Sequence, residues 1–315
     1  MKTLYGSVTG TTGLLSINVS NGHSTQMANA TIECRSTSLD IGDDITVDLG
    51  YTDDHGLVFT GYVKVIEEQG KPNSITITAS DELVRAADFF IVTTNPTTPL
   101  KVQNKSPEDI IEQLLDLAGI SDFEYDSSSY VWGVAGAITI DCVSVYDYSK
   151  MLADLIAWQF WADETGTVMF KDRRPYPMGG DSSIGTIWDN EIITIKDWKN
   201  DRSLRNKVVF WGATGIYAEA SDPDCPYVPD GFFKTAVASS PIIDDQDMAQ
   251  LACDFNLEVY NRLARGYTAT IIGDHGYNSR RVCHLDRTNE DVYIFSAEHS
   301  WGKSGYVTNL ELRKE

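Results

Sequence analysis

Hydrophobic and polar residues alternate along short stretches at both ends of the chain, and this period is typical of half-buried β-strands. In the first 95 residues the alternation covers 31–35, 45–49, 57–65 and 74–79, with Gly- and Asp-containing turns between them. It returns near the C-terminus at 267–272, 281–285, 292–299 and 306–312. The pattern predicts a small barrel or sandwich over residues 1–95 and an antiparallel sheet at the end of the chain.

The middle of the chain shows a helical period instead. Ser106 is a good N-cap, Pro107 suits the first helical position, and two acids follow. The next apolar residues share one helix face: Ile110, Ile111, Leu114, Leu115 and Ala118. A second helix is predicted near 147–157, followed by a hairpin with strands at 158–163 and 167–172. Residues 100–175 are therefore predicted to be α+β.

A long helix is predicted at 244–265, before the last four strands. Aspartates fill its first turn, Arg262 and Arg265 lie in its last turn, and Gly266 follows. Its expected buried face consists of Met248, Leu251, Ala252, Phe255, Val259 and Leu263. Between the insert and this helix, the sequence predicts strands at 184–188, 192–198 and 207–211 and an exposed loop at 221–231.

The chain is strongly acidic. Its 315 residues carry a formal net charge of −21, and its pI is about 4.5. A protein of this charge does not bind nucleic acid by neutralising phosphates. The acidity is expected to keep the protein soluble, and it would also suit the wall of a passage through which nucleic acid slips without sticking.

Neither a signal peptide nor a membrane-spanning segment is expected. The first residues lack an apolar core, and the longest apolar-rich stretch, 130–140, is short and interrupted by glycines. The five cysteines are odd in number and form no CxxC pair, which argues against a disulfide framework or a zinc knuckle. They suit a reducing cytosol, and Cys142 and Cys253 are expected to be buried small hydrophobes.

No catalytic, cofactor-binding or metal-binding residue is predicted. The five histidines form no HExxH or HxH motif, and His299 is expected to be a strand residue with local hydrogen-bond partners. The loop with Asp222, Asp224 and Asp230 lacks the alternation and the final Glu of a calcium loop. Asp163 and Glu164 fall in a hairpin turn, where exposure to solvent is expected. The seven tryptophans are expected in barrel cores and subunit interfaces.

The order of these pieces resembles the baseplate hub family of phage tails. This family includes the late control protein D family of contractile-tailed phages and the hub-like part of the type VI secretion spike. Residues 58–63 and 75–81 are similar to the strands, Gly and Asp that close the family's first barrel. Residues 105–120 resemble the helix of its inserted domain, and 148–170 are similar to its unit of a helix followed by a small hairpin.

The likeness continues to the end of the chain. Residues 206–212 resemble the strand that begins the family's second barrel, and 297–300 resemble part of its final strand. The chain departs from the family at 277–280, where Tyr-Asn-Ser-Arg replaces the usual Pro-Gly before a turn. The resemblance therefore covers nearly the whole chain and rests on the order and spacing of the motifs.

The resemblance implies a mainly β fold with an α+β insert and two tail-tube-like β-barrels per chain. The implied domains are a first barrel at 1–97, an inserted α+β domain at 98–178, and a second barrel at 179–315 that includes the helix 244–265. Three chains would form a pseudo-sixfold ring that joins the tail tube to the spike or tail tip and surrounds the DNA channel. Three copies would carry a formal charge of −63, three times −21.

The implied partners are two further copies of the chain, the tail tube protein, the spike or tail-tip protein and the tape measure protein. DNA would pass through the lumen without specific binding, and no membrane insertion, cofactor or enzymatic activity is implied. The implied location is the tail or baseplate of the virion, after assembly in the host cytoplasm. Some tail-tip hub proteins hold an iron–sulfur cluster, but Cys225, Cys253 and Cys283 are so widely spaced that only the fold could bring them together.

Two other functions are compatible with the sequence. The chain would be the hub-like N-terminal part of a tail-associated lysin, which is an enzyme, or a receptor- or glycan-binding protein of the tail tip. The first requires a catalytic domain, and the second requires aromatic side chains on the surface.

Overall fold

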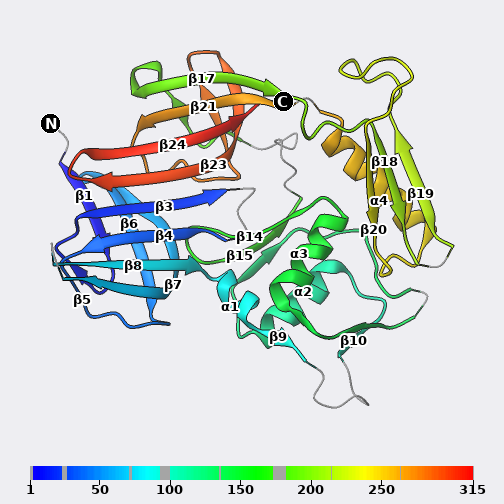
Figure 1. The fold of residues 1–315 in the computed structure, drawn as a ribbon, viewed down its shortest axis with the longest axis horizontal. Helices are drawn as coiled ribbons and strands as arrows, with labels where there is room; N and C mark the ends of the chain where they lie inside the picture. The colour runs from blue at the N-terminus through cyan, green and yellow to red at the C-terminus, as the bar shows by residue number, and fades with distance from the viewer. Residues whose placement is uncertain are drawn as a thin grey trace.

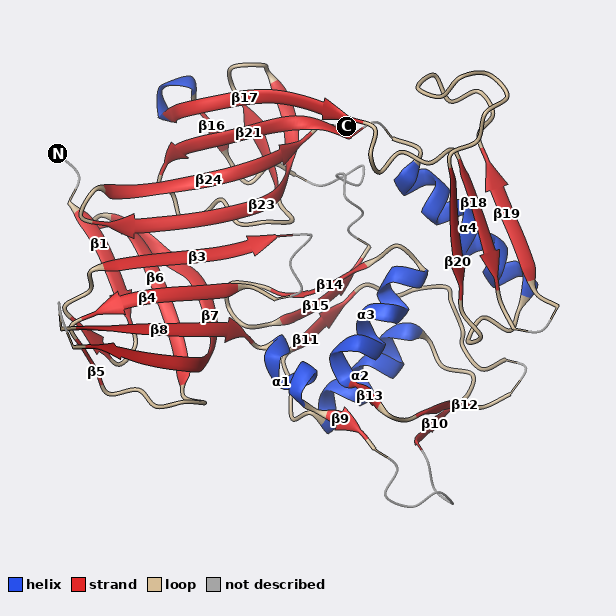
Figure 2. Cartoon of the chain, viewed as in Figure 1, coloured by secondary structure: helices blue, strands red, loops and turns tan. Residues whose placement is uncertain are grey.

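The fold is mainly β, with four α-helices in the part of the chain that is described (Figures 1 and 2). The structure is a computed structural model and describes residues 3–22, 27–70, 73–92, 100–134, 136–172, 182–213, 215–262 and 264–314. None of the helices in these ranges has both the length and the apolar character needed to cross a membrane. The predicted boundaries at 97/98 and 178/179 fall outside the described residues and stay predictions.

The first β-region is a curved antiparallel sheet of six strands in the order β1-β6-β7-β8-β4-β3. These strands are β1 (Leu4–Val8), β3 (Ser16–Gly22), β4 (Asn29–Cys34), β6 (Asp44–Tyr51), β7 (Asp54–Gln69) and β8 (Ser74–Asp81), and a small pair is formed by β2 (Thr11–Thr12) and β5 (Ser36–Thr37). Every second residue of the strands faces one core, which includes Ile17, Ile32, Val47 and Ile77. The alternation at 31–35, 45–49, 57–65 and 74–79 therefore predicted real strands.

The second β-region contains the strands from the end of the chain. Its main path is β23-β24-β21-β17, and β22 and β16 continue from the other side of β23. Its strands are β16 (Thr186–Ile187), β17 (Ile192–Asn200), β21 (Ala264–Ile272), β22 (Val282–Leu285), β23 (Glu290–Gly302) and β24 (Gly305–Arg313), with a 3-10 turn η1 (Asp189–Glu191) before β17. It has a separate core that includes Ile271, Leu285, Ile294 and Leu310. All four predicted C-terminal strands are present.

The two β-regions form one continuous sheet, because β3 pairs with β23. The antiparallel register runs from Gly22 opposite Ser296 to Ser16 opposite Gly302. The approach is close, since a Cβ atom on Gly22 would lie 2.8 Å from the Cβ of Ser296. The result is a 12-stranded sheet that curls into two barrel-like halves, seen at the left of Figure 1.

The segment after the first half is α+β, and it includes α1 and β9, which lie before the predicted start of the insert at residue 98 but share its core. It contains α1 (Leu83–Asp88), β9 (Phe90–Ile91), β10 (Leu100–Val102), α2 (Pro107–Leu117), β11 (Phe123–Tyr125), β12 (Ile138–Ile140), β13 (Val143–Ser144), α3 (Val145–Leu155), β14 (Gln159–Ala162) and β15 (Val168–Lys171). Two serines cap its helices: Ser106 accepts a hydrogen bond from the N–H of Asp109, and Ser144 accepts one from the N–H of Asp147. The predicted hairpin is β14–β15.

A fourth unit lies apart from the large sheet. Its strands β18 (Lys207–Trp211), β19 (Tyr217–Ser221) and β20 (Thr235–Ser239) form a separate sheet in the order β19-β18-β20. The helix α4 (Gln246–Tyr260) packs on β18 and β19, and its buried residues belong to the same core as those of the insert. The expectation that 207–211 begins the second barrel and that the long helix lies within it is therefore wrong.

The long helix is also shorter than predicted, and its buried face is only partly the predicted one: Met248 and Ala252 are buried as expected, whereas Leu251 is not. Asp245 is its N-cap and Asn261 its C-cap, so it occupies 246–260 and not 244–265. Met248, Ala249, Ala252 and Cys253 are buried, whereas the side chain of Leu251 is 41% exposed. The face that a helix buries depends on what it packs against, and small residues let α4 approach β18 and β19 closely.

Two substitutions on neighbouring residues of α4 test this face. Ala252→Asp should destabilise the protein by about 3 kcal/mol or more, because it buries an unpaired carboxylate. Leu251→Asp should cost about 1 kcal/mol or less, since the side chain stays in solvent. Urea unfolding of both purified variants measures the difference, and equal losses of stability would contradict the assigned face.

Candidate functional site: the junction of the two halves and the insert

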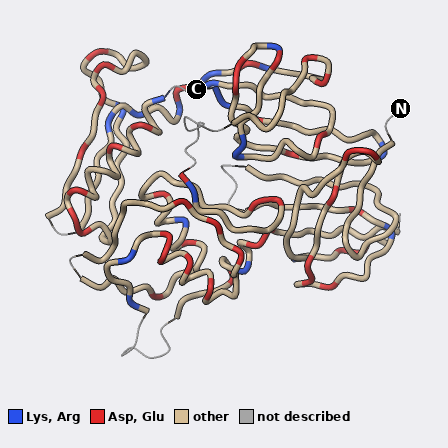
Figure 3. Tube along the Cα trace, turned by 180° about the vertical axis from the view of Figure 1, so that it is seen from behind, with Lys and Arg blue, Asp and Glu red and all other residues tan. Residues whose placement is uncertain are grey.

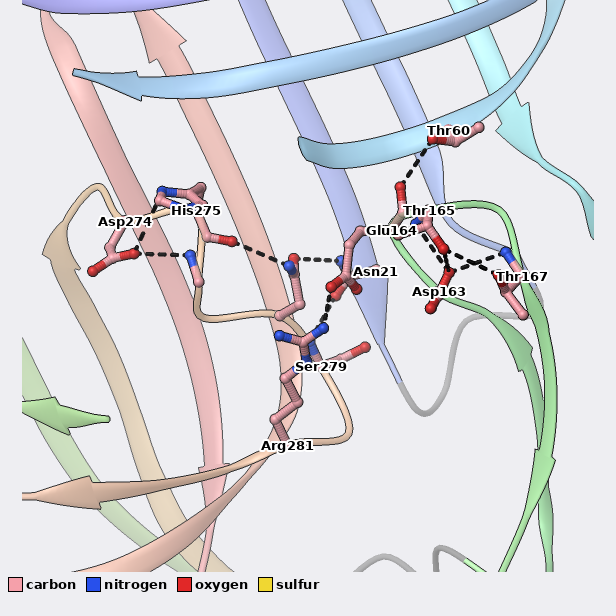
Figure 4. Close-up of polar contacts among 12 residues, drawn as sticks. Asn21, Thr60, Asp163, Glu164, Thr165, Thr167, Asp274, His275, Ser279 and Arg281 are labelled. Atoms are coloured by element: carbon pink, nitrogen blue, oxygen red, sulfur yellow. Dashed lines mark hydrogen bonds and ion pairs between the residues drawn. The ribbon is translucent and has the colours of Figure 1, made fainter. Parts of the chain in front are cut away.

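Polar residues from three parts of the chain meet where β3 and β23 approach the insert (Figure 4). Asn21 comes from β3 and Thr60 from β7 of the first half. The tip of the hairpin β14–β15, residues 163–167, comes from the insert. The loop 274–281, between β21 and β22, comes from the second half. We call this region the junction.

Arg280 is the central cation of the junction. Its Nε donates to Oε1 of Gln159 at 3.0 Å, and its two terminal nitrogens donate to the carbonyl of Gly22 at 2.7 Å and to Oγ of Ser279 at 3.0 Å. Its guanidinium lies over the ring of Trp161, with 5.2 Å to the ring centroid. Burial lowers the pKa of Arg280. One side chain thus binds the first half, the insert and its own loop.

Asp81, at the end of β8, is a buried acid that interacts electrostatically with Arg280. Its carboxylate accepts from the N–H of Ala28 at 2.6 Å and from the N–H of Leu83 at 3.1 Å. Burial raises the pKa of Asp81 to about 7, although the two backbone hydrogen bonds and the charge of Arg280 act in the opposite direction. The residue therefore fixes the start of α1 against the strand β4.

The hairpin tip is held from both sides. Arg281 donates to the carboxylate of Glu164, and Oγ1 of Thr60 donates to the carbonyl of Glu164 at 2.9 Å (Figure 4). Gly166 has a φ of +92°, and a Cβ there would lie 3.1 Å from Cγ2 of Thr60. The expectation that Glu164 points into solvent is wrong, because its side chain is only 16% exposed and pairs with Arg281.

The other acid of this turn, Asp163, shapes the turn itself. Its Oδ1 accepts from the N–H and the hydroxyl of Thr165 and from the N–H of Thr167. These contacts form an Asx-type turn, a common use of aspartate at such positions. Both acids of the hairpin therefore have a structural role.

His299 is the centre of a buried hydrogen-bond network in the second half. Its Nδ1 lies 2.8 Å from the hydroxyl of Tyr306, and its Nε2 lies 3.1 Å from Oδ1 of Asn278. Burial, together with the smaller effect of the neighbouring His275, lowers the pKa of His299 to about 3. At neutral pH the ring is therefore uncharged, so the Tyr306 hydroxyl donates to Nδ1 and Nε2 donates to Asn278. The expectation of local partners for His299 is confirmed.

The network continues from the second half to the first. Asn278 donates through Nδ2 to the carbonyl of His275 at 3.1 Å, and Asn21 donates to Oδ1 of Asn278 at 3.4 Å. In return, the N–H of Ser279 donates to Oδ1 of Asn21 at 3.2 Å. The loop 274–281 is thus bound to β3 beyond the end of the strand pairing (Figure 4).

The widely spaced cysteines stay apart. Cys225 packs with Leu204 and Val228, Cys253 lies in the core shared by the insert and α4, and Cys283 lies in the core of the second half. Burial raises the pKa of Cys253 to about 11 and that of Cys283 to about 12, so both thiols stay protonated. Cys142 is exposed, contrary to expectation, because it occupies a turn with a φ of +56°.

The acidic loop uses its aspartates internally. Oδ1 of Asp222 accepts from the N–H of Asp224 at 3.0 Å, and Asn261 donates to Oδ2 of Asp222 at 2.5 Å, which ties the loop to the C-cap of α4. Within the described ranges, no group of three or more His, Cys, Asp or Glu residues is placed to hold a metal ion. The aspartates of this loop therefore have a structural role.

Sequence reasoning missed most of the junction. Asn21, Gln159 and Arg280 carry no motif, and polar residues in loops usually face water. The one available signal was the departure from the family pattern at 277–280, which is the segment that contains Asn278 and Arg280.

Comparisons with known proteins identify the fold. No protein-family model matches the chain, and no curated protein matches it by sequence. Among solved structures, the 43 kDa tail protein of prophage MuSo2 from Shewanella oneidensis is similar over 100% of this chain and 98% of its own, with a TM-score of 0.69 and 15% identity. The tail protein of Neisseria meningitidis is similar over 99% and 97%, with a TM-score of 0.72 and 13% identity.

A third similar structure comes from a secretion system. An Escherichia coli component of the type VI secretion system, described as similar in structure to the T4 bacteriophage tail proteins gp27 and gp5, covers 99% of this chain and 77% of its own length. Its TM-score is 0.61 at 8% identity. The chain thus shares its mainly β fold with these phage tail proteins and with the type VI secretion component.

Replacement of Arg280 tests the central contact of the junction. Arg280→Met keeps the bulk of the side chain but leaves the Gln159 and Gly22 oxygens without their donor. We expect a loss of about 2–4 kcal/mol in the free energy of unfolding. Arg287→Met is the matched control, because Arg287 is exposed and lies 3.7 Å from its partner Asp189; its loss should stay near 0.5 kcal/mol or less. Equal effects of both substitutions would contradict a central role for Arg280.

The low pKa of His299 predicts a pH dependence of stability. The folded-state pKa lies below the ordinary value of 6.5, so the unfolded chain binds a proton first as the pH falls. The contribution of neutral His299 is complete above pH 6.5 and is lost as the pH falls from 6.5 toward 3. The stability gap between wild type and His299→Gln should therefore shrink by up to about 1.4 kcal/mol per pH unit below 6.5. Urea unfolding between pH 4.5 and 7.5 measures this gap, and parallel curves would refute the assignment.

Proposed function

We propose that the protein is a structural hub of a phage tail, in which three chains form a ring between the tail tube and the spike or tail tip. The observation that carries this proposal is the fold shared with two phage tail proteins over at least 97% of each chain. Identity of 13–15% transfers the fold alone. The ring is our extension of that likeness.

The internal arrangement supports a pseudo-sixfold ring. Each chain contributes two barrel-like halves that are joined edge to edge by β3 and β23. Three such chains would present six halves, which matches the sixfold tube on one side and a threefold tip on the other. The junction would keep the two halves of each chain at a constant angle, because its contacts are buried and come from both halves and the insert.

The charge of the chain supports a channel for DNA. Acidic residues occur along all parts of the fold, whereas several Lys and Arg gather near the C-terminus (Figure 3). A ring with a formal charge of three times −21 would repel phosphate and let DNA pass without specific binding. The further partners in this proposal are the tail tube, spike or tip, and tape measure proteins. The location is the virion tail or baseplate, after assembly in the host cytoplasm.

The proposed role is not enzymatic. The buried polar groups of the junction are bonded to neighbours from other parts of the fold, and both ring nitrogens of the buried His299 are occupied by hydrogen bonds. The lysin alternative predicts cell-wall hydrolysis by the purified chain, and the glycan-binding alternative predicts saturable glycan binding through exposed aromatic residues such as Trp188 and Trp211. The hub predicts neither.

The oligomeric state tests the hub directly. Purified protein should sediment as a trimer of about 105 kDa, three times 34.9 kDa, and electron microscopy should show a ring with six barrel-like densities. A chain that stays monomeric when mixed with tube and tip proteins, and that gives no threefold ring in isolated tails, would refute the proposal. Hydrolysis of purified cell walls would refute the non-enzymatic role separately.

A further inference from the structure

The strand β20 has an unprotected edge. Within the described residues it pairs with β18 alone, and its sequence from Thr235 to Ser239 contains neither a charge nor a proline. Val237 on this strand is 68% exposed. Natural edge strands usually carry lysine, proline or a bulge that prevents pairing with another chain. The N–H and C=O groups on this edge are therefore available to a further strand.

An apolar groove of about 560 Å³ lies along this edge. Four consecutive residues of β20, Ala236 to Ser239, line it, and successive side chains of a strand point to opposite faces, so the groove extends around β20 from the sheet face that it shares with Val208 of β18. Its opposite wall is α3, through residues such as Met151 and Leu155, and Phe210 and Ile242 also line it. This volume lies within the usual range of binding sites.

The groove continues into a basic cleft. This second cavity, of about 490 Å³, shares Lys150, Asp154, Asn256 and Tyr260 with the groove and extends to the C-terminal ends of α3 and α4. Four cations line it, Lys150, Arg262, Arg280 and Arg313, against the single carboxylate of Asp154. Such a surplus is unusual in a chain of net charge −21.

The cations at the rim can exchange their present partners. Lys150 pairs with Asp154 and Arg262 with Glu258, both as exposed pairs four residues apart on or beside a helix, and such pairs contribute little stability. Arg313 lies over the rings of Trp198 and Phe295, at 4.4 and 4.2 Å from their centroids, and also pairs with Glu311 at 2.7 Å. Arg280 is occupied by the junction, so an incoming acid would meet the other three.

We propose that the groove and the cleft together form a docking site for an extended segment of a partner protein. Alternating apolar residues of this segment pair with β20 as a fourth strand, and one or two acidic residues that follow lie in the basic cleft. Acidic residues are expected at that end of the segment because their charge is opposite to that of the cations in the cleft. A five-residue strand with both of its side-chain layers fills on the order of 800 Å³ at the usual strand spacings, more than the 560 Å³ of the groove, so one strand would already fill the groove and keep part of its side chains in solvent. The further strands of another sheet, as in a second copy, would lie outside the groove.

A designed peptide tests both parts of the site. The probe is a fluorescein-labelled peptide with five alternating Val and Thr residues followed by two Asp, added to the full chain and followed by anisotropy. We expect saturable binding, and binding at least about tenfold weaker for the same peptide with two Lys in place of the two Asp. Arg262→Glu should weaken binding of the Asp peptide to a similar extent. Lys196→Glu, an exposed charge change on β17, should leave it unchanged.

The backbone pairing is tested by N-methylated peptides, which leave the protein unaltered. Adjacent residues of a strand direct their N–H groups to opposite edges. One peptide is therefore N-methylated at its odd-numbered residues and a second at its even-numbered residues, and we expect one of the two peptides to lose binding and the other to keep it. Absence of saturable binding, equal binding of the Asp and Lys peptides, or equal binding of the two N-methylated peptides would overturn the proposal. Displacement of the peptide by self-association, detected by sedimentation, would identify a second copy as the occupant and would overturn it too. None of these outcomes depends on the threefold ring.

Discussion

The buried guanidinium of Arg280 joins the two halves of the sheet and the insert, and it forms no direct ion pair with a carboxylate among the described residues. Arg280 contacts a carbonyl of the first half, an amide of the insert and the face of Trp161, so desolvation of its charge is offset by three hydrogen bonds and a cation–π contact. Movement of any one part would leave the cation, or one of its acceptors, buried and unpaired. The pairing of β3 with β23 alone would let the two halves bend about the end of the paired strands. The contacts of Arg280, Asn21 and Asn278 oppose this bending.

The junction is polar, yet its bonding changes little near neutral pH. Burial keeps His299 uncharged and Tyr306 protonated, so the donors and acceptors in that network stay fixed. The ion pair of Arg281 with Glu164 binds the tip of the hairpin to the loop of the second half. Asp81 differs, since its pKa of about 7 means that its buried carboxylate loses and gains a proton in the neutral range. Its two backbone donors are satisfied by the carboxylate form.

The sequence predicted the features that depend on neighbouring residues. Alternation identified the strands, and Ser106 with Pro107 placed the start of α2 to the residue, because a cap and a fixed φ act locally. The errors concern contacts between distant segments. Leu251 satisfies the helical period but faces solvent, residues 207–211 form a strand that joins another sheet, and Glu164 has the sequence of a solvated turn but meets Arg281, 117 residues away. No local pattern encodes these partners.

The location of the basic residues connects the junction with the groove. Three of the four cations that line the cleft pair with a carboxylate, Lys150 with Asp154, Arg262 with Glu258 and Arg313 with Glu311, and packing holds two of the four as well. Arg280 is bound by the junction and Arg313 by two aromatic rings. The positive potential of the cleft is thus built into the scaffold and does not depend on flexible side chains. A scaffold that fixes a positive cleft beside an open strand edge is suited to the capture of an extended acidic segment, and the same contacts that fix the two halves also fix one end of that site.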